Sequence, residues 1–217
     1  MRTIVSMNKQ TQAARLAPVL VGVAVALGGL DAQERSPNEL VKAIQGGGYV
    51  LVMRHASSPR EAPSKEVANI DNTTLERQLD EAGRRGATAM GEALRALQIP
   101  IGSVLTSPTY RAMETVRLAR LNSPTVVNEL GDGGQSMQGT SETQASWLRT
   151  KVTEVPRSGS TVLVTHQPNL SRAFPDWGSA VLDGETVIIR PDGKGGIRVI
   201  GRIKIDDWSR LRGLDGN

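Results

Sequence analysis

The chain has 217 residues, of which 38% are hydrophobic, 3% aromatic and 22% charged, and its formal net charge is +4. This balance fits one folded domain and excludes an intrinsically disordered chain. Basic residues are scattered among acidic ones and aromatic residues are few, which argues against a nucleic-acid partner. The absence of cysteine excludes disulfides, thiolate nucleophiles and cysteine-based zinc sites, and with only two histidines we expect no metal or other cofactor.

The first 32 residues resemble a secretory signal peptide. Three basic residues precede an uncharged apolar stretch at residues 16–30, and Ala32 offers a cleavage site. At a rise of about 1.5 Å per residue this stretch reaches ~22 Å, which is short of a ~30 Å hydrocarbon core. We therefore expect cleavage, with an uncleaved anchor as the alternative. The mature chain would be a single domain over residues 33–217, secreted or periplasmic, with no stable membrane span.

Beyond this segment, helix and strand patterns alternate. In the first half of the chain, the sequence predicts a helix at 37–44, a strand at 49–54, an irregular excursion at 57–76, a helix that is N-capped by Asp80 and ended by Pro100, and a strand at 104–105. A helix that begins at Ser107-Pro108, a strand at 126–127 and a glycine-rich loop at 131–134 follow. The last predicted elements are a helix at about 140–155, a strand at 161–165, a hairpin at 185–189 and 197–203, and a helix at about 206–211. Such alternation is typical of a layered fold. We predict a three-layer α/β/α sandwich with a mainly parallel central sheet.

The helix that begins at Ser107-Pro108 carries three charged residues near its start. Arg111 lies in the first turn, and its place directly after the Ser-Pro pair favours a role at a site. Glu114 and Arg117 are spaced away from the apolar stripe of this helix. We therefore expect Glu114 and Arg117 to be solvent-exposed.

The two histidines of the chain occupy the same local setting. His55 and His166 each end an aliphatic run that reads as a buried strand, and each is followed within a few residues by polar residues and a proline. In open α/β sheets, ligands bind just beyond the carboxyl ends of such strands. Because Arg54 directly precedes His55, this pattern indicates a phosphate-handling centre.

Phosphoryl transfer requires groups that hold negative oxygens and a nucleophile that attacks phosphorus. Arginine suits the first task because its planar guanidinium can hold two oxygens at once. Without cysteine, a neutral imidazole is a competent nucleophile and would form a phosphohistidine that water later hydrolyses. Nearby guanidinium charges disfavour the imidazolium and keep such a histidine neutral.

Three motifs in this order resemble the histidine phosphatase superfamily, the phosphoglycerate mutase-like proteins, and specifically its smaller phosphatase branch. They are Arg54-His55-Ala56, the segment from Ser107-Pro108 through Arg111-Ala112 to Thr115, and Thr165-His166-Gln167-Pro168-Asn169. The segments at 77–83 and 184–193 also look like that branch. The resemblance covers about residues 48–211 and implies the phosphoglycerate mutase-like fold.

The resemblance also implies roles for the four residues that match the motifs. His55 would be the catalytic nucleophile that becomes phosphorylated. Arg54 and Arg111 would clamp the phosphoryl oxygens. His166 would donate a hydrogen bond to the phosphoryl group and stabilise the charge in transfer.

The family commonly adds a carboxylic acid that protonates the leaving oxygen. Glu129 follows a short predicted strand at the place where many members carry this acid, although the aromatic-rich motif that usually follows it is missing. Asp132 and Glu185 are rival candidates. Some small members lack the acid altogether and act on substrates with good leaving groups, such as phosphohistidine.

These observations predict an exported, metal-independent phosphatase that acts on a small phosphorylated substrate or a phosphoprotein. One alternative is a phosphatase for a sugar phosphate of the cell envelope, such as a lipopolysaccharide heptose phosphate. Another is a non-catalytic phosphate- or polyanion-binding protein on the same fold. The presence of both arginines and both histidines argues against the non-catalytic alternative.

Overall fold

The computed structural model describes residues 35–132 and 140–212. The predicted signal peptide and part of the predicted glycine-rich loop lie outside these residues. Within the two described ranges, no helix is both long enough and apolar enough to span a membrane.

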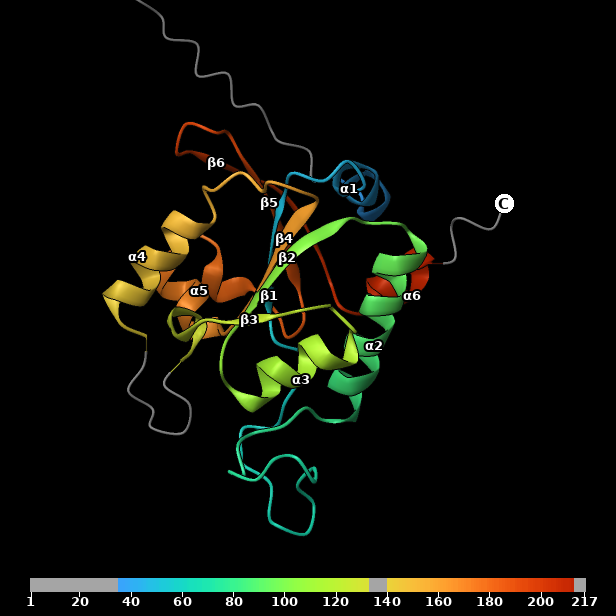
Figure 1. Ribbon diagram of the computed structural model, residues 1–217, viewed down its shortest axis with the longest axis vertical. Coiled ribbons are helices and arrows are strands. Elements are labelled where there is room, and N and C mark those ends of the chain that lie inside the picture. The colour runs from blue at the N-terminus through green and yellow to red at the C-terminus, as the bar shows by residue number, and fades with distance from the viewer. Residues whose placement is uncertain (1–34, 133–139, 213–217) are drawn as a thin grey trace, which may run out of the picture. The chain divides into compact units, whose positions relative to one another are not determined.

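Six strands of the described chain form one sheet in the order β3-β2-β4-β1-β5-β6 (Figure 1). They are β1 (Val50–Arg54), β2 (Ile101–Thr106), β3 (Thr125–Val126), β4 (Ser160–Thr165), β5 (Thr186–Pro191) and β6 (Ile197–Ile203). Strands β1 to β4 run parallel, whereas β5 pairs antiparallel with both β1 and β6. The mainly parallel sheet predicted from the sequence is confirmed.

Helices cover both faces of this sheet (Figure 1). The first face packs against α1 (Pro37–Ile44), α2 (Glu81–Ala96), α3 (Tyr110–Leu118) and α6 (Asp207–Leu211), and the second against α4 (Glu142–Lys151), α5 (Gln167–Ala173) and the short 3-10 helix η1 (Asn128–Leu130). Strand β1 contributes to both cores, since Leu51 and Met53 lie in one and Val50 and Val52 in the other. A second 3-10 helix, η3 (Gly178–Ala180), follows α5. The predicted three-layer sandwich is confirmed.

The parallel pairing of β1 with β4 brings the two histidines to the same edge of the sheet. Arg54 lies opposite Thr165 in the register, and the His55 backbone N–H donates to the Thr165 carbonyl at 3.0 Å. Strand β2 pairs with the other side of β4, and the Ser107 N–H donates to the carbonyl of Val164 at 3.0 Å. The three sequence motifs therefore meet at the carboxyl ends of three adjacent strands.

The loop that follows His55 is held against the start of α2. Asp80 caps this helix as predicted, accepting a hydrogen bond from the Gly83 N–H at 2.7 Å, and its other carboxylate oxygen accepts from the Ser57 hydroxyl at 2.6 Å. Gly83 permits this approach, because a Cβ there would lie 2.1 Å from the Ser57 carbonyl oxygen. The capping residue of α2 thus also positions the chain beside the histidine.

Helix α3 begins at Tyr110 and not at Pro108 as the Ser-Pro pair predicts. Thr109 occupies the N-cap position without a side-chain cap. The Ser107 hydroxyl accepts instead from the Thr109 N–H at 3.2 Å and faces His166, so Ser107 and Pro108 form a turn before the helix. Helix α4 is also shorter than predicted, ending at Lys151.

Glu114 is buried, contrary to the prediction that it faces solvent. Its side chain lies on α3 and is only 2% exposed. Its carboxylate accepts hydrogen bonds from the Leu79 N–H at 2.8 Å and from the Asn69 side-chain amide at 2.9 Å. The apolar stripe did not indicate this burial, because the partners come from the excursion that precedes α2. Arg117, by contrast, is exposed as expected.

The same excursion contacts the first turn of α3. The Glu76 carboxylate accepts from the Tyr110 N–H at 3.0 Å, and the Tyr110 hydroxyl donates to Asp71 at 2.5 Å. Figure 1 shows this segment as a long loop projecting beside α3, and Ile70 is fully exposed on it. The predicted irregular excursion is therefore tied to the helix that carries Arg111.

Replacing Glu114 with alanine is expected to lower the free energy of unfolding by about 1–3 kcal/mol, because the buried Leu79 N–H loses its acceptor. The matched control is Arg117→Ala on the same helix. It removes only the 3.9 Å ion pair between the exposed Arg117 guanidinium and Glu114, and it is expected to change that free energy by less than about 0.5 kcal/mol. Urea denaturation of the three proteins measures both effects. Equal losses in the two variants would contradict the anchoring role of Glu114.

Candidate active site

The two histidines lie side by side at the carboxyl edge of the sheet. Their ring centroids are 5.0 Å apart, and their residues are 4% (His55) and 1% (His166) exposed. The guanidinium of Arg111, from the first turn of α3, lies against both rings. Its Nε is 3.2 Å from Nε2 of His55, and one Nη is 3.2 Å from Nδ1 of His166. The structure thus brings together residues 56 and 55 positions apart in the sequence.

The contacts of His55 determine which ring nitrogen carries its proton. Nδ1 lies 2.8 Å from the Ala56 carbonyl oxygen, which can only accept, so the proton of the neutral ring is on Nδ1. Nε2 faces the Nε–H of Arg111, which can only donate, so Nε2 has its lone pair free of a proton. An unprotonated Nε2 is the form of imidazole that can attack phosphorus.

Burial holds the pKa of His55 well below its ordinary value, and the charges of His166, Arg111 and Arg54 lower it further. The hydrogen bond to the Ala56 carbonyl opposes this shift, but it does not reverse it. Because the lowered pKa lies below the usual value of about 6.5, the ring stays neutral at neutral pH. His55 is therefore electrostatically prepared to act as a nucleophile.

His166 is held from both sides of its ring. Nε2 lies 2.7 Å from the Ser107 hydroxyl and 3.3 Å from the Thr109 hydroxyl. Burial also keeps the pKa of His166 well below its ordinary value, and the charge of Arg111 is the next largest cause. Both histidines of the site are therefore neutral at neutral pH.

Arg54 ends β1 and turns toward the segment before β5. One Nη is 2.7 Å from the Asp183 carboxylate, and the other donates to the Val181 carbonyl at 3.2 Å. Its Nε is buried and has no hydrogen-bond partner among the described residues. A buried N–H without an acceptor is costly. An oxygen of a bound anion would satisfy it.

Asp132 is the acid candidate whose carboxylate lies against Arg111 and His166. Its Oδ2 lies 2.5 Å from an Nη of Arg111 and 3.4 Å from Nδ1 of His166, and its side chain is 14% exposed. This oxygen therefore contacts Arg111 and His166, both of which are expected to contact a phosphoryl oxygen. Asp132 was a rival for the acid role.

The other two acid candidates have different surroundings. Glu129 is half-buried on η1, and no hydrogen bond or ion pair links its side chain to the histidines or arginines within the described ranges. The Glu185 carboxylate accepts from the Leu182 N–H at 3.0 Å and lies 3.9 Å from an Nη of Arg202, so it closes the turn before β5. Geometry therefore favours Asp132 over both, while the role predicted for Glu129 stays a prediction.

A third arginine near the site was not singled out from the sequence. Arg77 is half-buried, and its guanidinium donates to the carbonyls of Ser58 and Pro59, at 3.2 Å and 2.6 Å, in the loop after His55. Burial lowers the pKa of Arg77, and the charge of Arg111 is the next largest cause. The only sequence signal was its position in the 77–83 segment that looks like the phosphatase branch.

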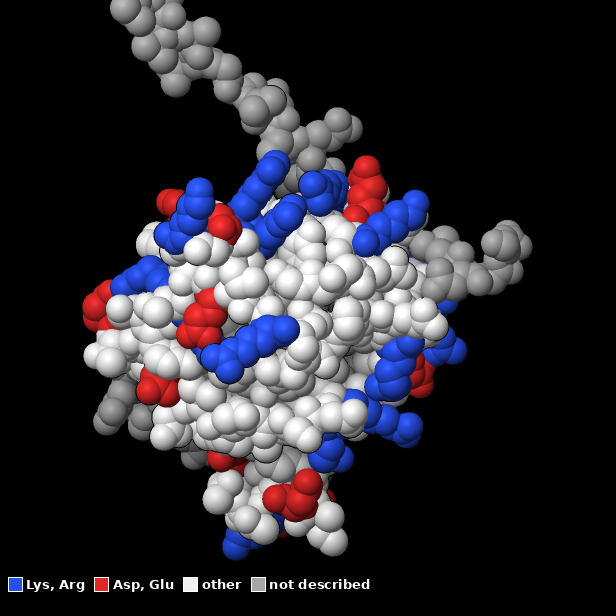
Figure 2. All heavy atoms as spheres, turned by 45° about the horizontal axis from the view of Figure 1, so that its top comes forward, with Lys and Arg blue, Asp and Glu red and all other residues white. Residues whose placement is uncertain are grey.

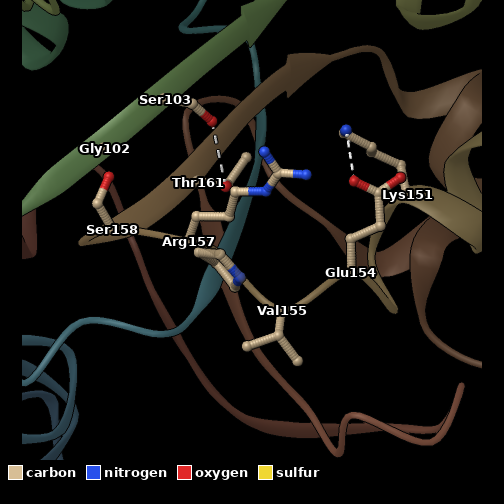
Figure 3. Close-up of a pocket in the computed structure, with 9 residues that line it drawn as sticks. Gly102, Ser103, Lys151, Glu154, Val155, Arg157, Ser158 and Thr161 are labelled. Atoms are coloured by element: carbon tan, nitrogen blue, oxygen red, sulfur yellow. Dashed lines mark hydrogen bonds and ion pairs between the residues drawn. The ribbon is translucent and has the colours of Figure 1, made fainter.

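One hollow of the described structure is at the opposite edge of the sheet from the histidines. It has a volume of about 390 Å³ and lies at the amino ends of β2 and β4 (Figure 3). The Ser103 hydroxyl donates to Thr161 at 3.2 Å there, and Lys151 forms an ion pair with Glu154 at 2.7 Å. Neither histidine nor either predicted clamp arginine lines this hollow. This hollow is therefore separate from the candidate site at the histidines.

Two properties bear on the ligands that the described part of the chain can bind. No cluster of three or more histidine, aspartate or glutamate side chains suited to a metal ion occurs within residues 35–132 and 140–212. On the face shown in Figure 2, basic side chains are interspersed with acidic ones and do not merge into one patch. Positive charge is concentrated around the buried histidines, where Arg54, Arg77 and Arg111 all act on His166.

Comparisons with known proteins agree with this geometry. Residues 50–132 match the model of the histidine phosphatase superfamily (branch 1), a range that includes Arg54, His55 and Arg111. The structure of the protein histidine phosphatase SixA complexed with tungstate is similar, with a TM-score of 0.54 and 19% identity over 73% of this chain and 98% of that chain. The predicted resemblance to the histidine phosphatase superfamily is confirmed. No curated protein matches the sequence.

Two further solved structures share the fold of this histidine phosphatase-like chain. A provisionally named phosphohistidine phosphatase SixA from Agrobacterium tumefaciens has a TM-score of 0.50 and 18% identity, over 72% of this chain and 98% of that chain. A protein from Escherichia coli K-12, provisionally named an alpha-ribazole-5'-P phosphatase, has a TM-score of 0.50 and 17% identity, over 71% and 96%. At these identities the likeness concerns the fold, so the substrate of this chain is a separate question.

Proposed function

We propose that this protein is an exported phosphatase that hydrolyses phosphomonoesters or phosphohistidine through a phosphohistidine intermediate on His55. The observation that carries the proposal is the unprotonated Nε2 of a buried, neutral His55 beside the guanidinium of Arg111. The proposed nucleophile, His55, is thus in direct contact with Arg111, a proposed ligand of the phosphoryl oxygens. The names of the SixA structures support phosphohistidine as one substrate class.

In the first step, Nε2 of His55 attacks phosphorus, and the bond from phosphorus to the leaving oxygen or nitrogen breaks. The leaving atom keeps the electron pair and takes a proton. Arg54 and Arg111 hold the remaining phosphoryl oxygens, whose negative charge their guanidiniums stabilise. In the second step, a water oxygen attacks phosphorus, the P–N bond breaks, and its electron pair returns to Nε2. The water proton is released, and inorganic phosphate leaves.

This reaction needs no metal ion, so the proposed activity would persist in a chelator such as EDTA. The guanidiniums of Arg54 and Arg111 balance the negative charge of the phosphoryl oxygens. The nucleophile, the neutral ring of His55, needs no counter-charge. His166 completes the scheme by donating a hydrogen bond to the phosphoryl group.

We assign the protonation of the leaving oxygen to Asp132. In the free protein its carboxylate is paired with Arg111. When phosphoryl oxygens bind Arg111 in its place, the Asp132 side chain is released from that pair and can deliver a proton to the leaving oxygen. Phosphohistidine has a good leaving group and depends less on this acid.

His55→Ala is expected to abolish both turnover and acid-labile phosphorylation of the protein, because the attacking nitrogen is lost. His166→Ala retains that nitrogen and is expected to slow phosphoryl transfer by a factor of ~10²–10³, the usual effect of losing one charge-stabilising donor. Rapid-quench trapping with an activated phosphate ester, followed by peptide mapping, locates the phosphate. Label on His166, or full activity in His55→Ala, would show that the assignment is wrong.

Asp132→Asn is expected to slow hydrolysis of esters with poor leaving groups by at least ~10²-fold, because general acid catalysis is lost. Hydrolysis of a phosphohistidine peptide by the same variant is expected to fall much less. Glu129→Gln is the matched control and is expected to leave both rates near wild type. Assaying a panel of sugar phosphates, other phosphomonoesters and phosphohistidine peptides measures both effects and searches for the substrate. The reverse ranking of the two variants would move the acid role to Glu129.

Export is proposed on the sequence of the first 32 residues. Protein recovered from its native host is expected to begin at residue 33, because the basic, apolar and small-residue regions fit a cleavable signal. Intact-mass measurement or N-terminal sequencing tests this. A full-length product extracted from membranes would indicate a retained anchor instead.

A further inference from the structure

The two nitrogens of His166 face chemically different partners. Nδ1 lies on the side of Arg111 and Asp132, whereas Nε2 lies 2.7 Å from the Ser107 hydroxyl and 3.3 Å from that of Thr109. Ser107 is completely buried and Thr109 nearly so. Because both hydroxyls are buried, each can form hydrogen bonds only with the protein groups around it.

The hydrogen-bond directions around the free ring can be assigned from these partners. A guanidinium only donates, and the Arg111 Nη lies closer to Nδ1, at 3.2 Å, than does the Asp132 oxygen, at 3.4 Å. Nδ1 therefore accepts, and the proton of the neutral ring is on Nε2. The Ser107 hydroxyl can accept this proton's hydrogen bond, because its own hydrogen is directed to the Thr109 hydroxyl at 3.2 Å.

This assignment has a consequence for catalysis. An Nδ1 that carries a lone pair repels a phosphoryl oxygen and cannot donate to it. The donor role expected of His166 therefore requires a second proton at Nδ1, which makes the ring an imidazolium. Ser107 suits both forms of the ring, since Nε2 donates to its hydroxyl oxygen in each.

The charges around the ring explain why the second proton would arrive only with the ligand. Among the described residues, the charged and titratable groups that contact His166 or act on its charge are Arg54 and His55 at the end of β1, Arg77 just before α2, Arg111 on α3 and Asp132 after η1. Three of these are cationic and one is anionic, which disfavours a further positive charge in the free protein. A phosphoryl dianion cancels that excess of positive charge and thereby favours the imidazolium.

We propose that Ser107 is a positioning residue that acts through His166. It holds the neutral ring in its Nε2–H form and allows Nδ1 to take up one proton when a phosphoryl group binds. The proposal rests on the proposed function for the identity of the ligand. The proton assignment of the free ring is a property of the protein alone and is tested without turnover.

The sequence makes the test direct, because a ¹⁵N spectrum of imidazole side chains contains signals from only two histidines. His55→Ala identifies the His166 signals by elimination. In the free wild-type protein, His166 is expected in the Nε2–H form. On addition of inorganic sulfate, a dianion that does not titrate between about pH 5 and 8, both nitrogens of His166 are expected to be protonated.

Proton uptake also predicts the sign of a pH effect on binding. Since the sulfate complex holds one proton more than the free protein, affinity is expected to rise as pH falls, by up to about tenfold per pH unit while free His166 stays neutral. Titration calorimetry in two buffers of different ionisation enthalpy counts the protons taken up. A free His166 in the Nδ1–H form, or no sulfate-dependent protonation of His166, would overturn the proposal.

Variants separate the role of Ser107 from a general structural effect. In Ser107→Ala, the Nε2–H of His166 loses its nearest acceptor, and only the Arg111 contact at Nδ1 still favours this form. The Nδ1–H form is therefore expected to become populated in part, and kcat is expected to fall by about tenfold with a smaller change in KM. Ser107→Thr keeps the hydroxyl and is expected to restore the Nε2–H form and most of kcat. An unchanged His166 spectrum in Ser107→Ala would overturn the role of Ser107. Loss of turnover on every phosphate tested, with the spectra as expected, would overturn only the proposed function.

Discussion

The guanidinium of Arg111 is the charge around which the candidate site is organised. It is buried and contacts Nε2 of His55, Nδ1 of His166 and the carboxylate of Asp132. A buried charge is stable only with close partners of complementary polarity. Here one carboxylate and two neutral imidazoles provide them, and the same arrangement leaves both rings unprotonated on the side that faces the guanidinium.

This arrangement depends on a short helix being held at the correct position along the sheet edge. The first turn of α3 contacts Glu76 of the excursion, and one turn later the buried Glu114 carboxylate accepts from Leu79 and Asn69. These are polar contacts between a helix and an irregular segment, so they have a defined direction that apolar packing lacks. The excursion thereby contributes to the placement of Arg111 as well as to the surroundings of the site.

The residues of the candidate site come from two kinds of segment, the ends of strands and loops outside the sheet. His55, His166 and Ser107 follow directly from three neighbouring parallel strands, whose backbone pairing sets their spacing. Arg77 and Asp132 come from loops, where side chains reach the site from outside the sheet. Rigid strand ends suit groups that must meet phosphorus, whereas loop residues suit discrimination among leaving groups.

The sequence by itself determined the layered fold and the position of the core site residues. Aliphatic runs that end at His55 and His166 indicate parallel strands, and parallel strands bring their carboxyl ends to one edge. Only the tertiary structure decided that Glu114 is buried, that α3 begins at Tyr110, and that Asp132 and not Glu129 lies against Arg111. Each of these depends on partners from distant segments, such as Leu79 for Glu114 and His166 for Ser107, and local periodicity contains no information about which distant polar groups a fold brings together.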